Sequence, residues 1–372
     1  MANKYTSVSD LFSDIAGAIR TKEGSSDAIS ASDFPDRISA LDKTAVTQWT
    51  DKFYKIISPE ISTVSAAITV KGITYYDGFW YAVGNDSAGD AYKLYGSTLG
   101  NLTAVKIGTG RNYPATGIVC DGTYVFIVCA AGSYNNRVAL RQTVADFLSS
   151  DTTLNAYANA TYYYSAACRV TGNYKFAFGG YVNGDGGAFA LISGTSLTWF
   201  GVAANIKEAF VDCCAFNETA VAVTPSGYVG WFKDLTGASY KNNKRAFLQG
   251  AQRCRQMGDY FCVACTKDDG TYLYYTSGDP INDVYGSLKI TDEVLTIVGM
   301  AYTGGLYTLV GVNSSGQTKV WQADALQNGG IYGQTMTLTS GYTPRVLATD
   351  GTNICVLADN GSNVLKALAT IS

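Results

Sequence analysis

The sequence contains no histidine, and only 15% of its 372 residues are charged. Without an imidazole, the chain has no histidine general base, no Ser-His or Cys-His nucleophile pair and no histidine metal ligand. Charged residues make up about 25% of an average globular chain, so the surface is expected to be unusually neutral. We therefore expect a protein that is not an enzyme and that carries no cofactor and no metal.

Basic runs and long apolar runs are also missing. The formal net charge is −3, which disfavours nucleic acid as a partner. No apolar run approaches the ~18 residues that a membrane-spanning helix needs, and the N-terminus lacks the apolar core of a signal peptide, so no membrane insertion is expected.

The nine cysteines lie mostly within apolar strand-like runs, which is typical of buried thiols in a chain folded in a reducing cytoplasm.

Glycine and tyrosine, by contrast, are abundant, with 40 and 27 copies, and they recur in a pattern. A strand, a short Gly, Asp or Asn turn and an apolar strand appear seven times, beginning with "TYYDGFWYAVG" (74–84). The spacing between copies is 41 to 50 residues. The turns centre on Gly78, Gly122, Gly172, Asn217, Gly258, Gly304 and Gly351.

A third strand follows each hairpin, and a more polar fourth strand is predicted for the first six units. Three of these fourth strands are "KRAFLQG" (244–250), "LTIVG" (295–299) and "MTLTSG" (336–341). Four antiparallel strands with a period of 40–50 residues are typical of a propeller blade. Because the seventh copy is one strand short, we expect residues 47–57 to supply its outer strand. The predicted fold is an all-β, seven-bladed β-propeller over residues 45–372, closed by an N-terminal strand in the last blade.

Residues 1–44 do not share the repeat and predict a short α-helical segment. Val8, Leu11, Phe12, Ile15 and Ile19 recur at helical spacing, and a second short helix is expected from about Ser32, with Phe34, Ile38 and Leu41 on its apolar face. Two such helices cannot form a stable core alone. They could pack on the propeller, dock onto another protein or self-associate into a homo-oligomer.

The segment 7–41, "SVSDLFSDIAGAIRTKEGSSDAISASDFPDRISAL", resembles the N-terminal segment of many bacteriophage tail and tail-fibre proteins. The resemblance covers about a tenth of the chain, and Glu23 departs from the threonine that is usual there. It implies a helical attachment segment, 1–44, that binds other virion tail or baseplate proteins. It also implies a place in the virion tail, after assembly in the cytoplasm of the bacterial host.

Propeller geometry predicts which loops face outward. Turns between second and third strands, and connections from one blade to the next, lie on the face opposite the N-terminal strand's entry. Aromatic rings beside amides and carboxylates suit binding to sugars. The candidate binding residues are Asp86, Asp90, Arg111, Tyr113, Tyr134, Asn135, Arg137, Tyr181, Asn183, Asp185, Asp268, Tyr342 and Arg345. The alternative is that they form ordinary polar turns.

Three functions remain open at this stage. The favoured one is a non-enzymatic tail fibre or receptor-binding protein whose propeller loops bind a bacterial surface glycan or protein. A purely structural virion component, such as a decoration, adaptor or baseplate protein, is the alternative. A polysaccharide-degrading glycosidase would need paired carboxylates about 5–10 Å apart, for which Asp86, Asp185 and Asp268 are the candidates. We predict no catalytic residues.

Overall fold

In the computed structural model the chain divides into two compact units, Met1–Phe53 and Tyr54–Ser372. Of the first unit the structure describes Ala16, Gly17 and Arg20, which are helical, and Ser30. In the second unit it describes 55–56, 60–62, 64, 67–107, 114–129, 137–158, 162–170, 176–182, 186–193, 196–203, 206–232, 240–327, 330–338, 341–360 and 364–370. The predicted contact residues Leu11, Phe12, Ile15, Ile19, Phe34, Ile38 and Leu41 lie outside these ranges.

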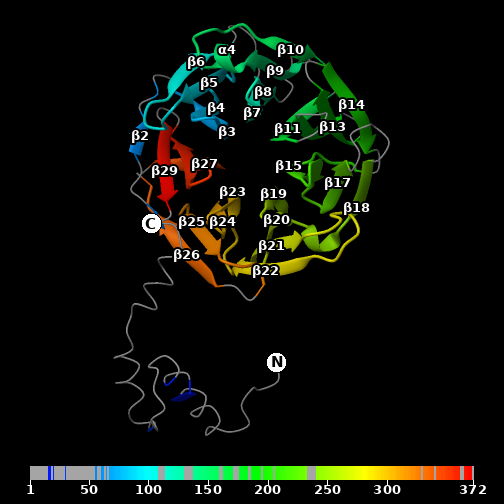
Figure 1. Cartoon of the computed structure of the whole chain (residues 1–372), viewed down its shortest axis with the longest axis vertical. Helices are drawn as coiled ribbons and strands as arrows, with labels where there is room; N and C mark the ends of the chain where they lie inside the picture. The colour runs from blue at the N-terminus through cyan, green and yellow to red at the C-terminus, as the bar shows by residue number, and fades with distance from the viewer. Residues whose placement is uncertain are drawn as a thin grey trace. The chain divides into compact units, whose positions relative to one another are not determined.

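The second unit is an all-β β-propeller, as the repeat predicts. Its described strands form seven antiparallel sheets arranged in a ring (Figure 1). The first strands of the sheets lie innermost: β3 (Thr69–Tyr76), β7 (Ala115–Cys120), β11 (Tyr162–Arg169), β15 (Asp212–Phe216), β19 (Ala251–Met257), β23 (Thr296–Thr303) and β27 (Thr343–Thr349). Each contacts the next in this order, and β27 contacts β3, so the ring is closed.

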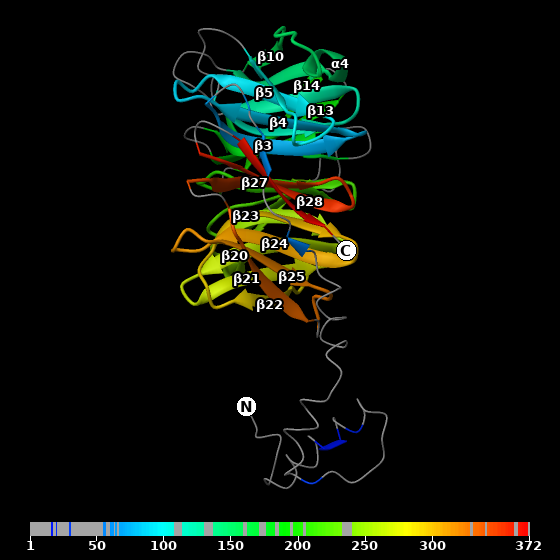
Figure 2. The ribbon, with the colours of Figure 1, turned by 90° about the vertical axis from the view of Figure 1, so that its left-hand side faces the viewer.

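The second and third strands follow outward in each sheet, and the edge-on view shows the sheets from the side (Figure 2). The second strands are β4 (Phe79–Asn85), β8 (Tyr124–Cys129), β12 (Phe176–Val182), β16 (Thr219–Val223), β20 (Tyr260–Lys267), β24 (Leu306–Val312) and β28 (Asn353–Asp359). The third strands are β5 (Ala91–Gly96), β9 (Arg137–Thr143), β13 (Gly186–Ser193), β17 (Tyr228–Phe232), β21 (Gly270–Thr276), β25 (Thr318–Ala323) and β29 (Val364–Thr370).

The outer strands of six sheets are β6 (Thr103–Lys106), β10 (Asn155–Ala158), β14 (Ser196–Ala203), β18 (Tyr240–Lys244), β22 (Gly286–Thr291) and β26 (Ile331–Met336). Three predicted outer strands were therefore placed too late in the sequence. The segment 244–250 forms the 3-10 turn η2 (Ala246–Leu248), and Thr296–Gly299 belongs to the inner strand β23. The apolar signal misled the prediction because outer strands are half-buried and polar, whereas inner strands are buried on both faces.

In the last sheet, β29 pairs with two short segments from the start of the unit, β1 (Lys55–Ile56) and β2 (Glu60–Ser62). Lys55 is opposite Thr370, and Glu60 is opposite Lys366. The register therefore changes by one residue between the two segments. The predicted outer strand, 47–57, overlaps this pairing only at its end, and residues 47–54 lie outside the described ranges.

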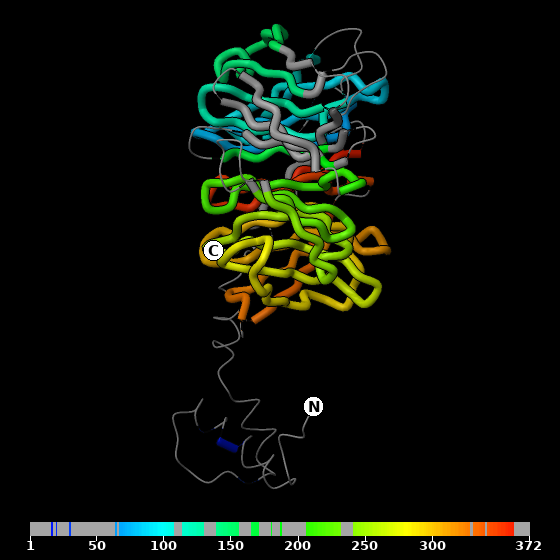
Figure 3. The backbone as a smooth tube through the Cα atoms, turned by 90° about the vertical axis from the view of Figure 1, so that its right-hand side faces the viewer, coloured from blue at the N-terminus to red at the C-terminus, as the bar shows by residue number. Residues whose placement is uncertain are grey.

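In each sheet the consecutive strands form a meander that runs alternately between the two faces of the ring (Figure 3). First-to-second and third-to-fourth turns consequently share one face, and the remaining connections share the other. A β-bulge near the start bends six of the first strands, as between Val70 and Gly72 in β3 and between Ala251 and Arg253 in β19. The helix α4 (Val144–Phe147) lies between β9 and β10.

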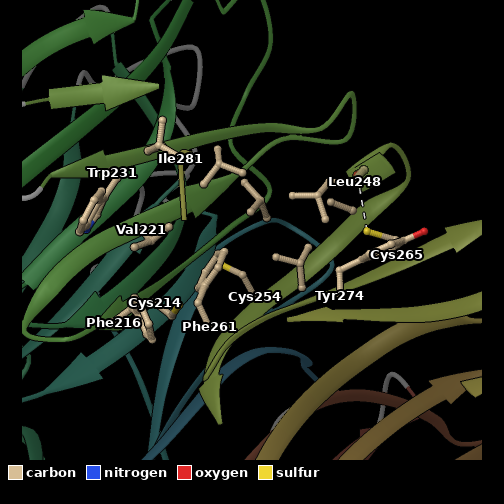
Figure 4. Close-up of a cluster of buried hydrophobic side chains, with 14 residues drawn as sticks. Cys214, Phe216, Val221, Trp231, Leu248, Cys254, Phe261, Cys265, Tyr274 and Ile281 are labelled. Atoms are coloured by element: carbon tan, nitrogen blue, oxygen red, sulfur yellow. Dashed lines mark hydrogen bonds between the residues drawn. The ribbon is translucent and has the colours of Figure 1, made fainter. Parts of the chain in front are cut away.

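The hydrophobic core lies in layers between neighbouring sheets. One layer joins the β15–β18 sheet to the β19–β22 sheet, where the Phe216 and Phe261 rings lie 5.8 Å apart (Figure 4). Trp80 and Tyr81, in the opening hairpin, are buried in two such layers on opposite faces of their sheet. All nine cysteines are free; eight are buried and Cys168 is half-buried. Burying both faces of every sheet explains the low charge content.

Candidate functional site

The centre of the ring contains a cavity that is lined by described residues. Its volume is about 430 Å³, and it is lined by the later halves of all seven first strands. These strands run toward the face that carries the first-to-second turns, so this cavity opens toward that face. The lining segments are 73–76, 118–120, 167–169, 213–215, 255–256, 300–302 and 347–349. We call this cavity the channel mouth.

A second cavity of about 130 Å³ is lined by earlier residues of the same strands and therefore lies nearer the opposite face. It shares Ile73, Ile118, Ala167, Arg255 and Leu347 with the channel mouth. The two cavities therefore adjoin at the level of Arg255, and we call them together the channel.

The channel carries an excess of positive charge. Arg169 and Arg255 line the channel mouth, and no Asp or Glu is among its described lining residues. The second cavity adds Lys71 and Arg253, together with the single carboxylate of Asp212. Four cations thus surround one carboxylate, although the whole chain has a formal charge of −3. A channel with one sign of charge and low-dielectric walls focuses the field and attracts anions.

Arg255 is held in a fixed position. Its Nη1 donates to Oδ2 of Asp212 at 2.9 Å and to the carbonyl oxygens of Cys213 and Cys254 at 3.2 and 2.8 Å. The buried Asp212 carboxylate also accepts from the Cys254 N–H at 3.0 Å. Burial alone would lower the pKa of Arg255, but Asp212 raises it well above its usual value. The guanidinium therefore stays charged wherever the protein is folded.

Arg169 is exposed at the end of β11, and its guanidinium lies 5.4 Å from the centre of the Tyr76 ring. A cation at this distance from an aromatic face gains about 0.5–1 kcal/mol at an exposed site. Tyr76 reaches this position across the turn at Gly122, whose φ is +93° and where an added Cβ would lie 2.4 Å from the Tyr76 hydroxyl oxygen. The glycine turn of one sheet thus positions a ring from the sheet before it.

Four thiols line the same cavity, those of Cys120, Cys168, Cys213 and Cys214. The hydrogen bond between the Cys168 thiol and Cys213, which favours the protonated thiol, and burial together raise the pKa of Cys168 well above its usual value. Because the thiolate is the nucleophile, a raised pKa leaves this group protonated and unreactive at neutral pH. What the channel mouth offers chemically is positive charge, hydrogen-bond donors and aromatic surface.

The predicted loop residues on the other face take several different positions. Asp86 and Asp90 are brought together, since both pair with Lys106, at 3.2 and 2.7 Å. Asp86 also accepts from the N–H groups of Ala88 and Asp90. These interactions stabilise the turn between β4 and β5. Asp268 is exposed at the tip of the turn between β20 and β21.

Arg345 pairs with the fully buried Asp359, and Tyr342 is half-buried before β27. Arg137 and Tyr181 are placed only as backbone of β9 and β12, with Tyr181 opposite Gly187. The other predicted binding residues, Arg111, Tyr113, Tyr134, Asn135, Asn183 and Asp185, lie outside the described residues.

Sequence reasoning missed the cations of the channel. A signal was present, because "CRVTG" and "CRQMG" place Arg169 and Arg255 three residues before the turn glycines Gly172 and Gly258. A charged residue at the same repeat position of an otherwise apolar inner strand indicates a shared environment that is not core. The structure shows that this environment is the channel mouth.

The fold and channel define a β-propeller, and comparison with solved structures agrees. "YCF48 bound to D1 peptide" superposes with a TM-score of 0.59 at 11% identity, covering 86% of this chain and 98% of that one. "Structure of the Neurospora crassa Pan2 WD40 domain" gives a TM-score of 0.56 at 12% identity, covering 87% and 97%. At this identity the likeness concerns the fold alone. No protein-family model and no curated protein sequence matches the chain.

Within the part of the chain that the structure describes, no helix has the length and apolar character needed to cross a membrane. The same residues contain no group of three or more Cys, Asp or Glu side chains placed to hold a metal ion.

Proposed function

We propose that this protein is a non-enzymatic receptor-binding or tail-fibre component of a bacteriophage virion. In this proposal the N-terminal segment, 1–44, attaches it to other tail or baseplate proteins, and the propeller binds a glycan or protein on the bacterial surface. The resemblance of 7–41 to phage tail proteins supports the attachment role. The protein would assemble in the host cytoplasm and reside in the virion tail, with neither nucleic acid nor membrane as a partner.

The propeller itself is proposed to be seven-bladed, with the N-terminal segments β1 and β2 completing the last blade. The seven sheets and the pairing of both segments with β29 support this interpretation. Lys55 and Thr370 are paired neighbours, so the linker to residues 1–53 leaves from the outermost strand of its sheet.

The observation that carries the binding role is the channel mouth. It combines two guanidinium groups with the rings of Tyr76 and Tyr302 and contains no carboxylate among its described lining residues. Such a lining holds a ligand by charge, hydrogen bonds and aromatic contact, and it lacks the carboxylate pair that glycoside hydrolysis needs. Two of the glycosidase candidates considered from the sequence, Asp86 and Asp268, lie in turns outside this cavity.

A peptide or protein ligand has one independent argument in its favour, because a structural neighbour of similar fold was solved with a bound peptide. A weak site would suffice for either ligand class. Several copies in one particle, whether held by the virion or by self-association through 1–44, would combine through avidity.

The test is direct binding of the purified, fluorescently labelled full chain to a panel of bacterial strains. We expect saturable binding to a subset of strains, and labelling of virion tails by antibodies raised against the protein. Tail labelling without binding to any strain would replace this proposal with a purely structural virion component. Absence from the particles would refute the virion role itself.

A further inference from the structure

The channel mouth contains two cations, Arg169 and Arg255, and no carboxylate is among its described lining residues. Arg255 is fixed by Asp212, which lines only the smaller cavity, and Arg169 is held over the Tyr76 ring. Arg169 makes no ion pair within the described ranges, where its charge meets only an aromatic face. An anion entering the channel mouth would therefore meet positive charge that is already oriented and only partly compensated.

The hydrogen-bonding capacity of Arg255 is only partly used. Among the described residues, its hydrogen bonds all come from Nη1, so the Nε and Nη2 donors remain for a ligand. A guanidinium presents its donors as a planar fork that matches a carboxylate or phosphate, and such charged hydrogen bonds are roughly twice as strong as neutral ones.

The remainder of the lining favours a small ligand with both apolar and hydroxyl-bearing surfaces. Tyr302, 39% exposed, packs its ring against Tyr307 at 4.8 Å and lies on the lining with Tyr76 and Thr349. A sugar ring presents C–H faces to aromatic rings and hydroxyls to polar groups, whereas a flat apolar ligand would leave the polar groups unpaired. The volume of about 430 Å³ falls within the roughly 300–1,000 Å³ of small-molecule sites.

The charge distribution also disfavours a long polyanion. Four cations gather at the centre of the ring, while the chain as a whole is negative, at −3. A single anionic unit at the channel mouth gains the local attraction without bringing further negative charge against the surrounding surface.

We propose that the channel mouth binds a sugar unit bearing a carboxylate or a phosphate, with Arg169 and Arg255 on the anionic group and Tyr76 and Tyr302 beside the ring. This rests on the proposed receptor-binding function and specifies its ligand as an acidic unit of a surface glycan. The site lies in the channel, rather than on the loops of the opposite face.

The experiment is titration calorimetry of the full chain with glucuronate, glucose 6-phosphate and neutral glucose. We expect one site per chain for at least one acidic sugar, weakening with added salt, and no heat from glucose. The difference between glucuronate and the sugar phosphate identifies the anionic group. Arg169→Ala should weaken binding about tenfold, because an exposed cation is removed without disturbing a buried pair. Lys241→Ala, which removes an exposed cation on the outer strand β18, should leave binding unchanged.

Two results would overturn the inference. One is the absence of saturable binding by both acidic sugars up to millimolar concentrations, including the case in which a short peptide with a free carboxylate binds instead. The other is equal affinity of the wild type and Arg169→Ala, with Tyr302→Ala also unchanged. If the full chain still binds bacterial cells in either case, the receptor-binding function stands and its site lies elsewhere.

Discussion

The Asp359 carboxylate accepts a hydrogen bond from the backbone N–H of Val70 at 3.0 Å, although 289 positions separate the two residues. The contact joins the last sheet to the first. Asn85 joins the first sheet to the second in a similar way, through hydrogen bonds of 2.8 and 3.0 Å with the backbone of Ala115. First strands are edge strands with unpaired backbone groups, and these side chains satisfy some of them.

Removing the Asp359 side chain should destabilise the ring. Asp359 is fully buried and also binds Arg345, so Asp359→Ala leaves a buried N–H and a guanidinium without their acceptor. We expect a loss of about 2 kcal/mol in the free energy of unfolding, measured by urea denaturation. Asp359→Asn keeps an acceptor and should lose less. Asp268→Ala, at an exposed turn, is the control, and an equal loss there would contradict the role of the contact.

Deletion of the N-terminal segments tests the closing strand. A chain lacking residues 1–53 keeps β1 and β2 and should melt at the same temperature as the full chain. A chain lacking residues 1–62 leaves β29 as an open edge, which should lower the melting temperature and promote self-association. Calorimetry and light scattering measure the two effects. Equal behaviour of the two deletions would show that β1 and β2 do not stabilise the ring.

Lys93 gives a pH-dependent prediction. It is fully buried, and its Nζ donates to the carbonyl oxygens of Asp146 and Asp151 and to Oε1 of Gln142. Burial lowers its pKa from 10.5 to about 8, although the nearby Asp151 and Asp146 oppose the shift. Between these two pH values the unfolded chain binds the proton more strongly than the folded chain, so stability rises with pH.

The matched variant is Lys93→Met, which cannot titrate. The difference in free energy of unfolding between the wild type and this variant should be constant below pH 8. As the pH rises from 8 toward 10.5, the free energy of unfolding of the wild type should increase relative to that of Lys93→Met. Denaturation curves at several pH values provide the measurement, and a difference that stays flat across this window would show that the buried amine keeps its ordinary pKa.

Substitutions at two turn glycines allow the cost of backbone strain to be measured apart from the cost of steric overlap. Gly89 and Gly250 have φ values of +82° and +84°, but an added Cβ meets nothing within 4 Å at Gly89 and lies 2.0 Å from the Thr266 carbonyl oxygen at Gly250. Gly89→Ala should cost only the left-handed strain, about 1–2 kcal/mol. Gly250→Ala should cost more, because the backbone must also move. Equal melting temperatures for the two variants would contradict this packing.

The hairpins of the propeller could be predicted from the sequence because their turns need particular residues. Asp77 and Gly78 have φ values of +45° and +80°, and Asn217 and Glu218 have +45° and +66°, so the Asp-Gly and Asn-Glu positions mark true turns. Outer strands such as Tyr240–Lys244 could not be located, because a polar, half-buried strand carries no alternating apolar signal.

The channel was not predicted, because the shared repeat position of Arg169 and Arg255 does not by itself show that their strands meet at one centre. Arg169 and Arg255 look like isolated cations until the ring brings β11 and β19 to one centre. The same holds for Lys93, whose amine donates to backbone carbonyls in the connection between β9 and β10. Asp86 and Asp90 were predicted as ligand-binding residues from their loop position and chemical type, whereas the structure pairs both with Lys106.

The most direct test of the account is flow cytometry of bacterial cells incubated with the labelled full chain, comparing the wild type with Arg169→Ala and Lys241→Ala. We expect saturable binding by the wild type and Lys241→Ala, and about tenfold weaker binding by Arg169→Ala. Binding of equal strength by all three proteins would contradict the claim that the channel mouth recognises the receptor.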